Sequence, residues 1–207
     1  MKKIIAASIL LLLMLTGAGT IVVDNGKLEL SSKLTSIIKG MNAQPSWAKS
    51  LVEIELIDKL DEQRGFCIDI RGHKQRAKIE RGLQAHTCYS YQGQLGVDQA
   101  FDKQLISRDK FYLPAFNVCM EANGSIAGSS LKLEVCDDIG TQRFKLTANN
   151  QIKLISNNEL CIAIDPNGSK QGGGGTPPHL LRSLALANCE KSETKYTNWR
   201  MRSPSSN

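Results

Sequence analysis

Six cysteines occur in this chain as three successive pairs, and this repetition constrains the fold more than any other feature. Each first cysteine lies in a short segment with the pattern of a strand, and each second cysteine ends another apolar segment. The first cysteines are Cys67, Cys119 and Cys161, and the second are Cys88, Cys136 and Cys189. An aromatic residue follows each pair, at Phe101, Phe144 and Trp199. A unit of about 45 residues cannot bury an apolar face alone, so the repetition predicts three copies packed together.

The start of the chain bears on the state of these cysteines. Basic residues within 1–3 precede the uncharged apolar run 4–15, and small residues at 17–19 offer cleavage points. This is the pattern of a secretory signal, so we expect a signal peptide over residues 1–20 and a secreted or periplasmic protein. An uncleaved anchor is the alternative, because residues 21–23 extend the apolar run to about the twenty residues that span a bilayer.

An even number of regularly spaced cysteines in an exported chain predicts disulfides. A bond that every repeat can form internally pairs Cys67 with Cys88, Cys119 with Cys136, and Cys161 with Cys189. Each bond is expected to stabilise the fold by about 2–4 kcal/mol. A zinc site is disfavoured, since no Cys-x-x-Cys spacing occurs and the three histidines are scattered. We therefore expect neither a metal nor another cofactor.

Length and charge limit the classes of partner. The 207 residues leave room for one domain of about 150 residues and a short extension. The formal net charge is +6, from 26 basic and 20 acidic residues, and the basic residues are dispersed along the chain. A dispersed excess of this size is typical of a solvated surface, so no nucleic-acid partner is expected.

The segment before the repeats has a different pattern. Within residues 24–49, apolar side chains recur at helical spacing, at Leu30, Leu34, Ile37, Ile38 and Met41. This predicts a partly helical N-terminal extension over residues 21–51, in which Pro45 ends a short amphipathic helix. We expect its apolar face to pack on its own domain. A helix that binds a membrane surface or a partner is the alternative.

From residue 52 the period of the apolar pattern changes to two. The stretch 52–56 alternates apolar residues with two glutamates, which predicts a strand with one buried face. A turn at 61–65 leads to a second strand at 66–70. The same hairpin recurs over 151–164, and a weaker version runs over 111–122. Many short strands and almost no helical pattern predict an all-β fold, and threefold repetition favours a closed, pseudo-symmetric arrangement.

These repeats resemble the ricin-type (ricin B-like) β-trefoil lectins. That family has three repeats, each with a Cys-x-Asp-hydrophobic strand, a second cysteine and a Gln-x-Trp or Gln-x-Phe motif. The motif stands here as Gln99-Ala-Phe101 and Gln142-Arg-Phe144, whereas Thr197-Asn-Trp199 keeps the aromatic residue and loses the glutamine.

The resemblance covers about residues 52–202 and implies an all-β fold, a β-trefoil. We expect a lectin domain over residues 52–205, with repeats at about 52–104, 105–148 and 149–203. The resemblance also implies that Phe101, Phe144 and Trp199 are core residues that meet near the pseudo-symmetry axis, rather than ligand contacts.

The resemblance places sugar-binding groups at defined positions. The acid lies two residues after the first cysteine, a stacking ring lies two before the second, and a polar residue lies two further back. An Asn or Asp often precedes the motif glutamine. In the first repeat these positions hold Asp69, His86, Gln84 and Asp98, followed by Gln99. All five can bind a sugar hydroxyl or cover a pyranose face.

The other two repeats depart from this pattern. The second has Glu121, Lys132 and Glu134 at the corresponding positions, where Glu121 and Lys132 can simply form an exposed ion pair. The third has Ala163, Ala185 and Ala187, which remove the acid, the polar partner and the ring together. We therefore expect one principal site, in the first repeat. Tyr89 and Tyr91 can add an aromatic face to that site if their loop folds back.

The resulting hypothesis is a non-enzymatic carbohydrate-binding protein whose partners are glycans or glycoconjugates. Contact with a membrane is expected only if the signal is not cleaved. The alternative is a β-trefoil interaction scaffold, such as an inhibitor or a subunit of a toxin or adhesion complex, that binds a protein rather than a sugar. Hydrolysis is disfavoured, because no pattern brings candidate catalytic residues together.

Overall fold

The computed structural model describes residues 22–24, 27–29, 50–93 and 95–203. The chain divides into two compact units, Met1–Ala48 and Lys49–Asn207. In the first unit, β1 (Val22–Asp24) pairs antiparallel with β2 (Lys27–Glu29). The predicted signal peptide and the helix expected between Leu30 and Met41 lie outside the described residues. Among the described residues, no helix is long and apolar enough to cross a membrane.

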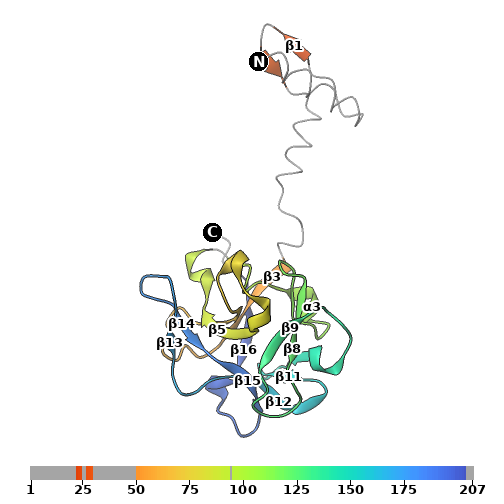
Figure 1. The fold of residues 1–207 in the computed structure, drawn as a ribbon, viewed down its shortest axis with the longest axis vertical. Coiled ribbons are helices and arrows are strands. Elements are labelled where there is room, and N and C mark those ends of the chain that lie inside the picture. Colours follow the sequence, from red (N-terminus) through yellow and green to blue (C-terminus); the bar gives the residue numbers. More distant parts are fainter. Residues whose placement is uncertain (1–21, 25–26, 30–49, 94, 204–207) are drawn as a thin grey trace. The chain divides into compact units, whose positions relative to one another are not determined.

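The second unit is a β-trefoil, as the repeats predict (Figure 1). The first repeat holds β3 (Leu51–Leu56), β4 (Phe66–Ile70), β5 (Leu83–Thr87) and β6 (Phe101–Asp102). The second holds β7 (Tyr112–Leu113), β8 (Val118–Ala122), β9 (Leu131–Glu134) and β10 (Phe144–Leu146). The third holds β11 (Ile152–Leu154), β12 (Asn157–Ile164), β15 (Leu184–Asn188) and β16 (Trp199–Arg202), with β13 (Lys170–Gln171) and β14 (Leu180–Arg182) inserted.

Short helical elements occupy the connections. One α-helical turn, α3 (Lys103–Ile106), begins after Asp102, whose carboxylate accepts hydrogen bonds from the backbone of Gln104 and Leu105. The 3₁₀ turns are η2 (Lys74–Arg76), η3 (Ile79–Arg81), η4 (Tyr89–Gln92), η5 (Gly140–Gln142) and η6 (Thr194–Tyr196). Of these, η4 follows Cys88 directly.

The middle strands of each repeat form an antiparallel hairpin with the same register. Cys67 pairs with His86 across β4 and β5, Cys119 with Glu134 across β8 and β9, and Cys161 with Ala187 across β12 and β15. Each first cysteine therefore lies opposite the residue two before the second cysteine. Positions counted from the cysteines are equivalent in space, so side chains can be compared between repeats.

The motif aromatics are core residues, as predicted. Phe101, Phe144 and Trp199 are fully buried. Phe111 lies between the first two, with its ring centroid 6.1 Å from that of Phe101 and 6.2 Å from that of Phe144, both edge-to-face. Trp199 Nε1 donates a hydrogen bond of 2.9 Å to the Ile162 carbonyl, so its one polar atom is satisfied in the core.

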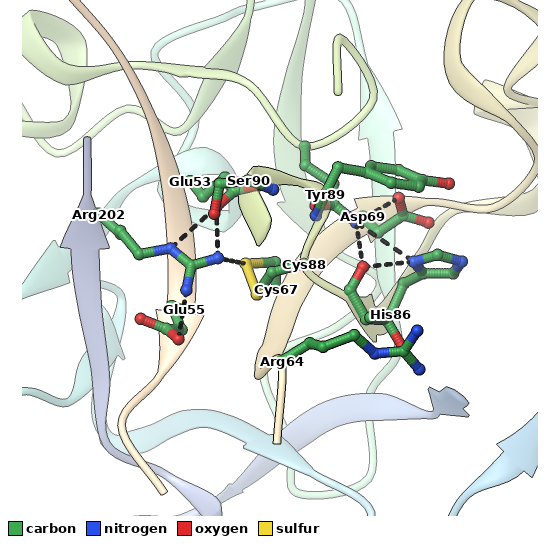
Figure 2. The surroundings of a disulfide bond; sticks show 12 residues. Glu53, Glu55, Arg64, Cys67, Asp69, His86, Cys88, Tyr89, Ser90 and Arg202 are labelled. Carbon is green, nitrogen blue, oxygen red and sulfur yellow. Dashed lines mark hydrogen bonds and ion pairs between the residues drawn. A yellow bond between two sulfur atoms is a disulfide. The ribbon is translucent and has the colours of Figure 1, made fainter. Parts of the chain in front are cut away.

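The prediction that β3 has one buried face is wrong, since both faces are buried. Glu53 and Glu55 are fully buried because β16 pairs with β3 and brings arginines onto the glutamate face. Arg202 forms ion pairs of 2.7 Å with each glutamate (Figure 2). Arg200 forms an ion pair of 2.8 Å with Glu55. Burial alone raises the pKa of Glu55, but hydrogen bonds from Lys59 and Arg200 and the Arg202 charge hold it below its usual value.

Two of the three predicted disulfides are present. Cys67 bonds to Cys88 and Cys119 bonds to Cys136. The prediction for the third pair is wrong, because Cys161 and Cys189 are free, buried thiols. The Cys161 thiol lies 3.8 Å from the Ala187 carbonyl, to which it donates. Burial, followed by the hydrogen bond with Cys189, raises the pKa of Cys161, and a protonated thiol is a poor nucleophile.

Candidate functional site

The acid predicted to bind sugar is at the centre of a hydrogen-bonded group in the first repeat. Asp69 on β4 lies opposite Gln84 on β5, and Gln84 Nε2 donates 3.0 Å to Asp69 Oδ1. Gln99 Nε2 donates 3.1 Å to Asp69 Oδ2. Both carboxylate oxygens therefore have an amide partner, and Asp69 is fully buried. Its pKa is raised well above the usual value, first by desolvation and then by the neighbouring Asp98.

Gln99 ties this carboxylate to the backbone that follows β5. Its Oε1 accepts 2.9 Å from the Tyr89 backbone N–H, and its Nε2 also donates 3.1 Å to the Thr87 carbonyl. The motif glutamine is thus a clamp that joins the acid, the end of β5 and the start of η4. It positions Asp69 and is itself fully buried.

The second repeat has the same clamp on a different acid. Gln142 Nε2 donates 2.8 Å to Glu121 Oε2 and 3.0 Å to the Val135 carbonyl, and its Oε1 accepts 2.7 Å from the Asp137 backbone N–H. Glu121 also pairs with Lys132 at 3.1 Å, as the sequence suggested. The free carboxylate oxygen is therefore neutralised by a lysine instead of facing an amide.

The third repeat has lost the clamp together with the acid. Ala163 lies opposite Ala185, and with Ala187 they line an apolar hollow of about 260 Å³. Thr197 stands at the glutamine position. Its hydroxyl is buried, with no hydrogen-bond partner among the described residues. This repeat offers no polar group at the predicted sugar position.

His86, the predicted stacking residue, is surrounded by other rings. Its ring centroid lies 5.0 Å from that of Tyr89, with an interplanar angle of 40°, and 5.0 Å from that of His179, edge-on. Figure 2 shows His86 and Tyr89 beside Asp69. His86 Nδ1 lies 2.7 Å from the Thr87 carbonyl, which can only accept, and 3.3 Å from Gln99 Nε2, which can only donate. The shorter contact favours a proton on Nδ1. Tyr91 adds a hydrogen bond of 3.0 Å between its hydroxyl and His179 Nε2.

Burial makes both histidines hard to protonate. Desolvation lowers the pKa of His86 to about 4, although the Thr87 carbonyl acts in the opposite direction. Desolvation and the Arg64 guanidinium lower the pKa of His179. Both rings are therefore neutral at pH 7, when they act as stacking groups and single hydrogen-bond donors or acceptors.

Asp98 lies beside this group and is only half satisfied. Its Oδ2 accepts a short hydrogen bond from the Lys74 backbone N–H, whereas its Oδ1 is buried and has no partner among the described residues. Desolvation raises its pKa. A buried carboxylate oxygen without a donor is costly, and it marks a place where a hydroxyl group could donate.

The five predicted residues converge, but they form a closed group. Asp69, Asp98 and Gln99 are fully buried, His86 is 4% exposed and Gln84 is 7% exposed. Gln84 lines a cavity of about 100 Å³. The sequence positions correctly predict which side chains come together, while their burial was not predicted.

Part of the closure comes from an element that the sequence did not assign to this site. Strand β14 of the third repeat pairs with β5, so that Leu181 lies opposite His86 and Arg182 opposite Ala85. His179, just before β14, reaches the ring cluster in this way. The only signal was the glycine-rich stretch 172–175 followed by two prolines, which indicates a loop without identifying the strand it joins.

Among the comparisons with known proteins, the one with solved structures supports the fold. No protein-family model matches the sequence, and no curated protein matches it. The solution structure of the mdaA-1 domain matches with a TM-score of 0.52 and 14% identity, over 75% of this chain and 91% of that one. A non-toxic homologue of type II RIPs from bitter gourd (Momordica charantia), in complex with α-methyl-D-galactoside, matches with a TM-score of 0.51 and 14% identity, over 74% of this chain.

The C-half of an earthworm R-type lectin, in complex with GalNAc, has a TM-score of 0.49 at 14% identity, over 74% of this chain and 98% of that one. The chain spans about half the length of the bitter gourd protein (48%) and of an agglutinin from Abrus precatorius (46%). The likeness to the mdaA-1 domain and to the bitter gourd protein, both with TM-scores above 0.5, supports the fold, and at 14% identity it leaves the function to the residues of the site.

Proposed function

We propose that this protein is a non-enzymatic carbohydrate-binding protein of the lectin type, with its one sugar site in the first repeat. The observation that carries the proposal is the group around Asp69, in which Gln84 and Gln99 orient the carboxylate beside His86 and Asp98. A carboxylate and amides can pair with vicinal hydroxyl groups, and a flat ring can cover the apolar face of a sugar.

Three further observations support the proposal. In the second repeat the same glutamine clamp holds Glu121, but Lys132 forms an ion pair with that acid. The third repeat has alanines at the corresponding positions. The bitter gourd protein that shares the fold was solved with a galactoside. Binding of a glycan or glycoconjugate needs no cofactor.

The proposal extends to the organisation of the chain. We take residues 1–20 as a signal peptide, 21–51 as an N-terminal extension and 52–205 as the lectin domain, in a secreted or periplasmic protein. Support comes from the basic and apolar start of the sequence and from the two disulfides, which persist in oxidising compartments.

A glycan array followed by calorimetric titration tests the proposal. We expect dissociation constants near 1 mM, about 4 kcal/mol, for a monosaccharide at a single site. Asp69→Asn should abolish binding, because an amide nitrogen, which can only donate, replaces one of the two acceptor oxygens of the carboxylate. Glu121→Gln, at the matched position of the second repeat, should leave binding unchanged. Binding that survives Asp69→Asn and disappears with Glu121→Gln would move the site to the second repeat.

A second candidate function is an interaction scaffold for a protein partner, and the burial of all five predicted residues favours it. A pull-down that yields a stoichiometric protein partner, with binding unaffected by added sugars and by Asp69→Asn, would support the scaffold over the lectin.

A further inference from the structure

Tyr89 occupies the position that a sugar ring would need. A sugar bound to Asp69 and stacked on His86 would lie between these two side chains. The Tyr89 ring instead lies against His86, with 5.0 Å between the ring centroids and an interplanar angle of 40°, and Figure 2 shows it beside Asp69. Its exposed fraction is 3%. A Cβ at Gly96 would overlap the Tyr89 ring, so a glycine is required where the ring lies.

Residues 172–182, here called the strap, hold Tyr89 in this position from the third repeat. The His179 ring lies edge-on to Tyr89 at 5.6 Å, while Lys74 lies on another side, with Nζ 5.7 Å from the Tyr89 ring centroid. The backbone N–H of Ser90, the residue after Tyr89, donates 3.0 Å to the buried carboxylate of Glu53. Tyr89 is thus fixed by its own turn, by the first repeat and by the strap.

The strap attaches to the first repeat through a small set of polar contacts. Arg64 donates 2.8 Å to the carbonyls of both Pro177 and Pro178, and the Leu180 N–H donates 2.8 Å to Thr87 Oγ1. Arg182, which is also buried, pairs with Asp61 at 2.8 Å, the Tyr91 hydroxyl lies 3.0 Å from His179 Nε2, and β14 pairs with β5 at two positions. Strand β14 lies between β13 and β5, and because its ladder with β5 covers only two residue pairs, local opening of the strap costs less than unfolding of the trefoil.

The turn of the strap is built on glycines. Gly174 and Gly175 have φ angles of +90° and +77°, a region that glycine adopts without strain. They lie between β13, which pairs with β14, and the His179 end that contacts the rings. Opening of the strap would free one side of Tyr89 while leaving the Asp69 clamp in place.

We propose that Tyr89 and the strap close the first-repeat site in the sugar-free protein, and that sugar binds only after Tyr89 leaves the face of His86. This inference rests on the proposed sugar-binding function. It makes the third repeat, which has lost its own site, the part of the molecule that controls access to the first. The observed affinity for sugar is then the intrinsic affinity multiplied by the open fraction.

Two variants open the site by different routes. Tyr89→Ala removes the ring that covers Asp69, and His179→Ala removes the side chain of the strap that contacts it. Tyr112→Ala, whose hydroxyl bonds to Asn117 in the second repeat, is the matched control. Circular dichroism and an unfolding curve establish that each variant is folded before the measurements that follow.

The first measurement needs no sugar. Diethyl pyrocarbonate modifies exposed, neutral imidazoles, and mass spectrometry locates the modified residue. His86 should react slowly in the wild type and in Tyr112→Ala, and at least tenfold faster in Tyr89→Ala and His179→Ala. Rapid modification of His86 in the wild type would overturn the closure.

The second measurement is calorimetric titration of the same four proteins with α-methyl-D-galactoside and with N-acetylgalactosamine. We expect at least tenfold tighter binding by Tyr89→Ala and a smaller gain by His179→Ala, with Tyr112→Ala unchanged. Binding of equal strength by all four proteins would overturn the inference and leave the proposed function intact. If His86 becomes reactive in the opened variants while none of the proteins binds any sugar on an array, the closure stands and the proposed function fails.

Discussion

The motif glutamine of the first two repeats connects three groups in the same way. Gln99 and Gln142 each bind a buried carboxylate, a carbonyl just before the second cysteine and the N–H just after it. The residue that corresponds to them in the third repeat, Thr197, has a buried hydroxyl without a partner among the described residues. The same position of the repeat therefore holds a clamping glutamine in the first two repeats and a buried, unsatisfied hydroxyl in the third.

This difference predicts opposite responses to removal of the polar group. Gln99→Leu leaves an Asp69 oxygen and the Tyr89 N–H without their partner, so the free energy of unfolding should fall by about 1–3 kcal/mol. Thr197→Val removes a hydroxyl that has no partner in the described part of the chain and should leave stability unchanged or slightly higher. Urea unfolding at pH 7 measures both. Equal losses in the two variants would contradict the clamp.

His86 should make the fold sensitive to acid. Its pKa is about 4 in the folded chain and about 6.5 in the unfolded chain. The stability that its neutral form contributes is present above pH 6.5 and is lost as the pH falls through about 4. The loss amounts to at most about 3 kcal/mol. In His86→Leu, unfolding free energies measured between pH 7 and pH 4 should lack this loss.

Asp69 should change the stability with pH in the opposite direction to His86, so variants of the two residues separate their contributions. Its folded-state pKa is raised, so its contribution is present at low pH and is lost as the pH rises through that value. Asp69→Asn should remove the loss at high pH and retain the acid loss due to His86. A loss between pH 7 and pH 4 that persists unchanged in His86→Leu would show that another group is responsible.

At the scale of elements, the strands predicted from alternation and turns are present, and the three hairpins share one register. What the sequence could not show is the neighbour of each strand. The glutamates in β3 suggested a solvent-facing side. Alternation of polar and apolar residues shows which residues share a face of a strand, but it does not show whether another element covers that face. Pairing with β16, almost 150 residues away, brings Arg202 onto that face. The pairing of β14 with β5, in which Leu181 lies opposite His86, is also long-range.

The ion network between β16 and β3 predicts unequal costs for two neighbouring arginines. Arg202→Met leaves Glu53 and Glu55 buried without their shared cation and should lower the unfolding free energy by about 3–5 kcal/mol. The Arg200 side chain is 49% exposed and its partner Glu55 keeps other cations, so Arg200→Met should cost under about 1 kcal/mol. Thermal unfolding of the two variants compares them. Similar shifts in Tm would contradict a buried network.

At the scale of the whole molecule, the three copies have diverged in their chemistry while sharing their geometry. Counting from the cysteines correctly predicted that Asp69 meets Gln84, that Glu121 meets Lys132 and that Ala163 meets Ala185. The count could not predict closure, because the covering ring and the strap come from segments outside the equivalent positions. It also predicted a third disulfide that the structure does not contain.

The cysteines provide a prediction for the intact chain. Two disulfides and two thiols predict that the unfolded, unreduced protein exposes two groups that react with a thiol reagent such as Ellman's. The folded protein should react slowly, because both thiols are buried. Peptide mapping should place the label on Cys161 and Cys189. A count of zero in denaturant would contradict the free thiols.

The central claim is that three copies of the fold leave one sugar site, and that Tyr89 covers it. A crystal structure of Tyr89→Ala soaked with α-methyl-D-galactoside tests this claim most directly. We predict one sugar per chain, with hydroxyl groups on Asp69 and Gln84 and its apolar face on His86. A sugar bound beside Glu121 instead, or none at concentrations that saturate binding in solution, would contradict the account.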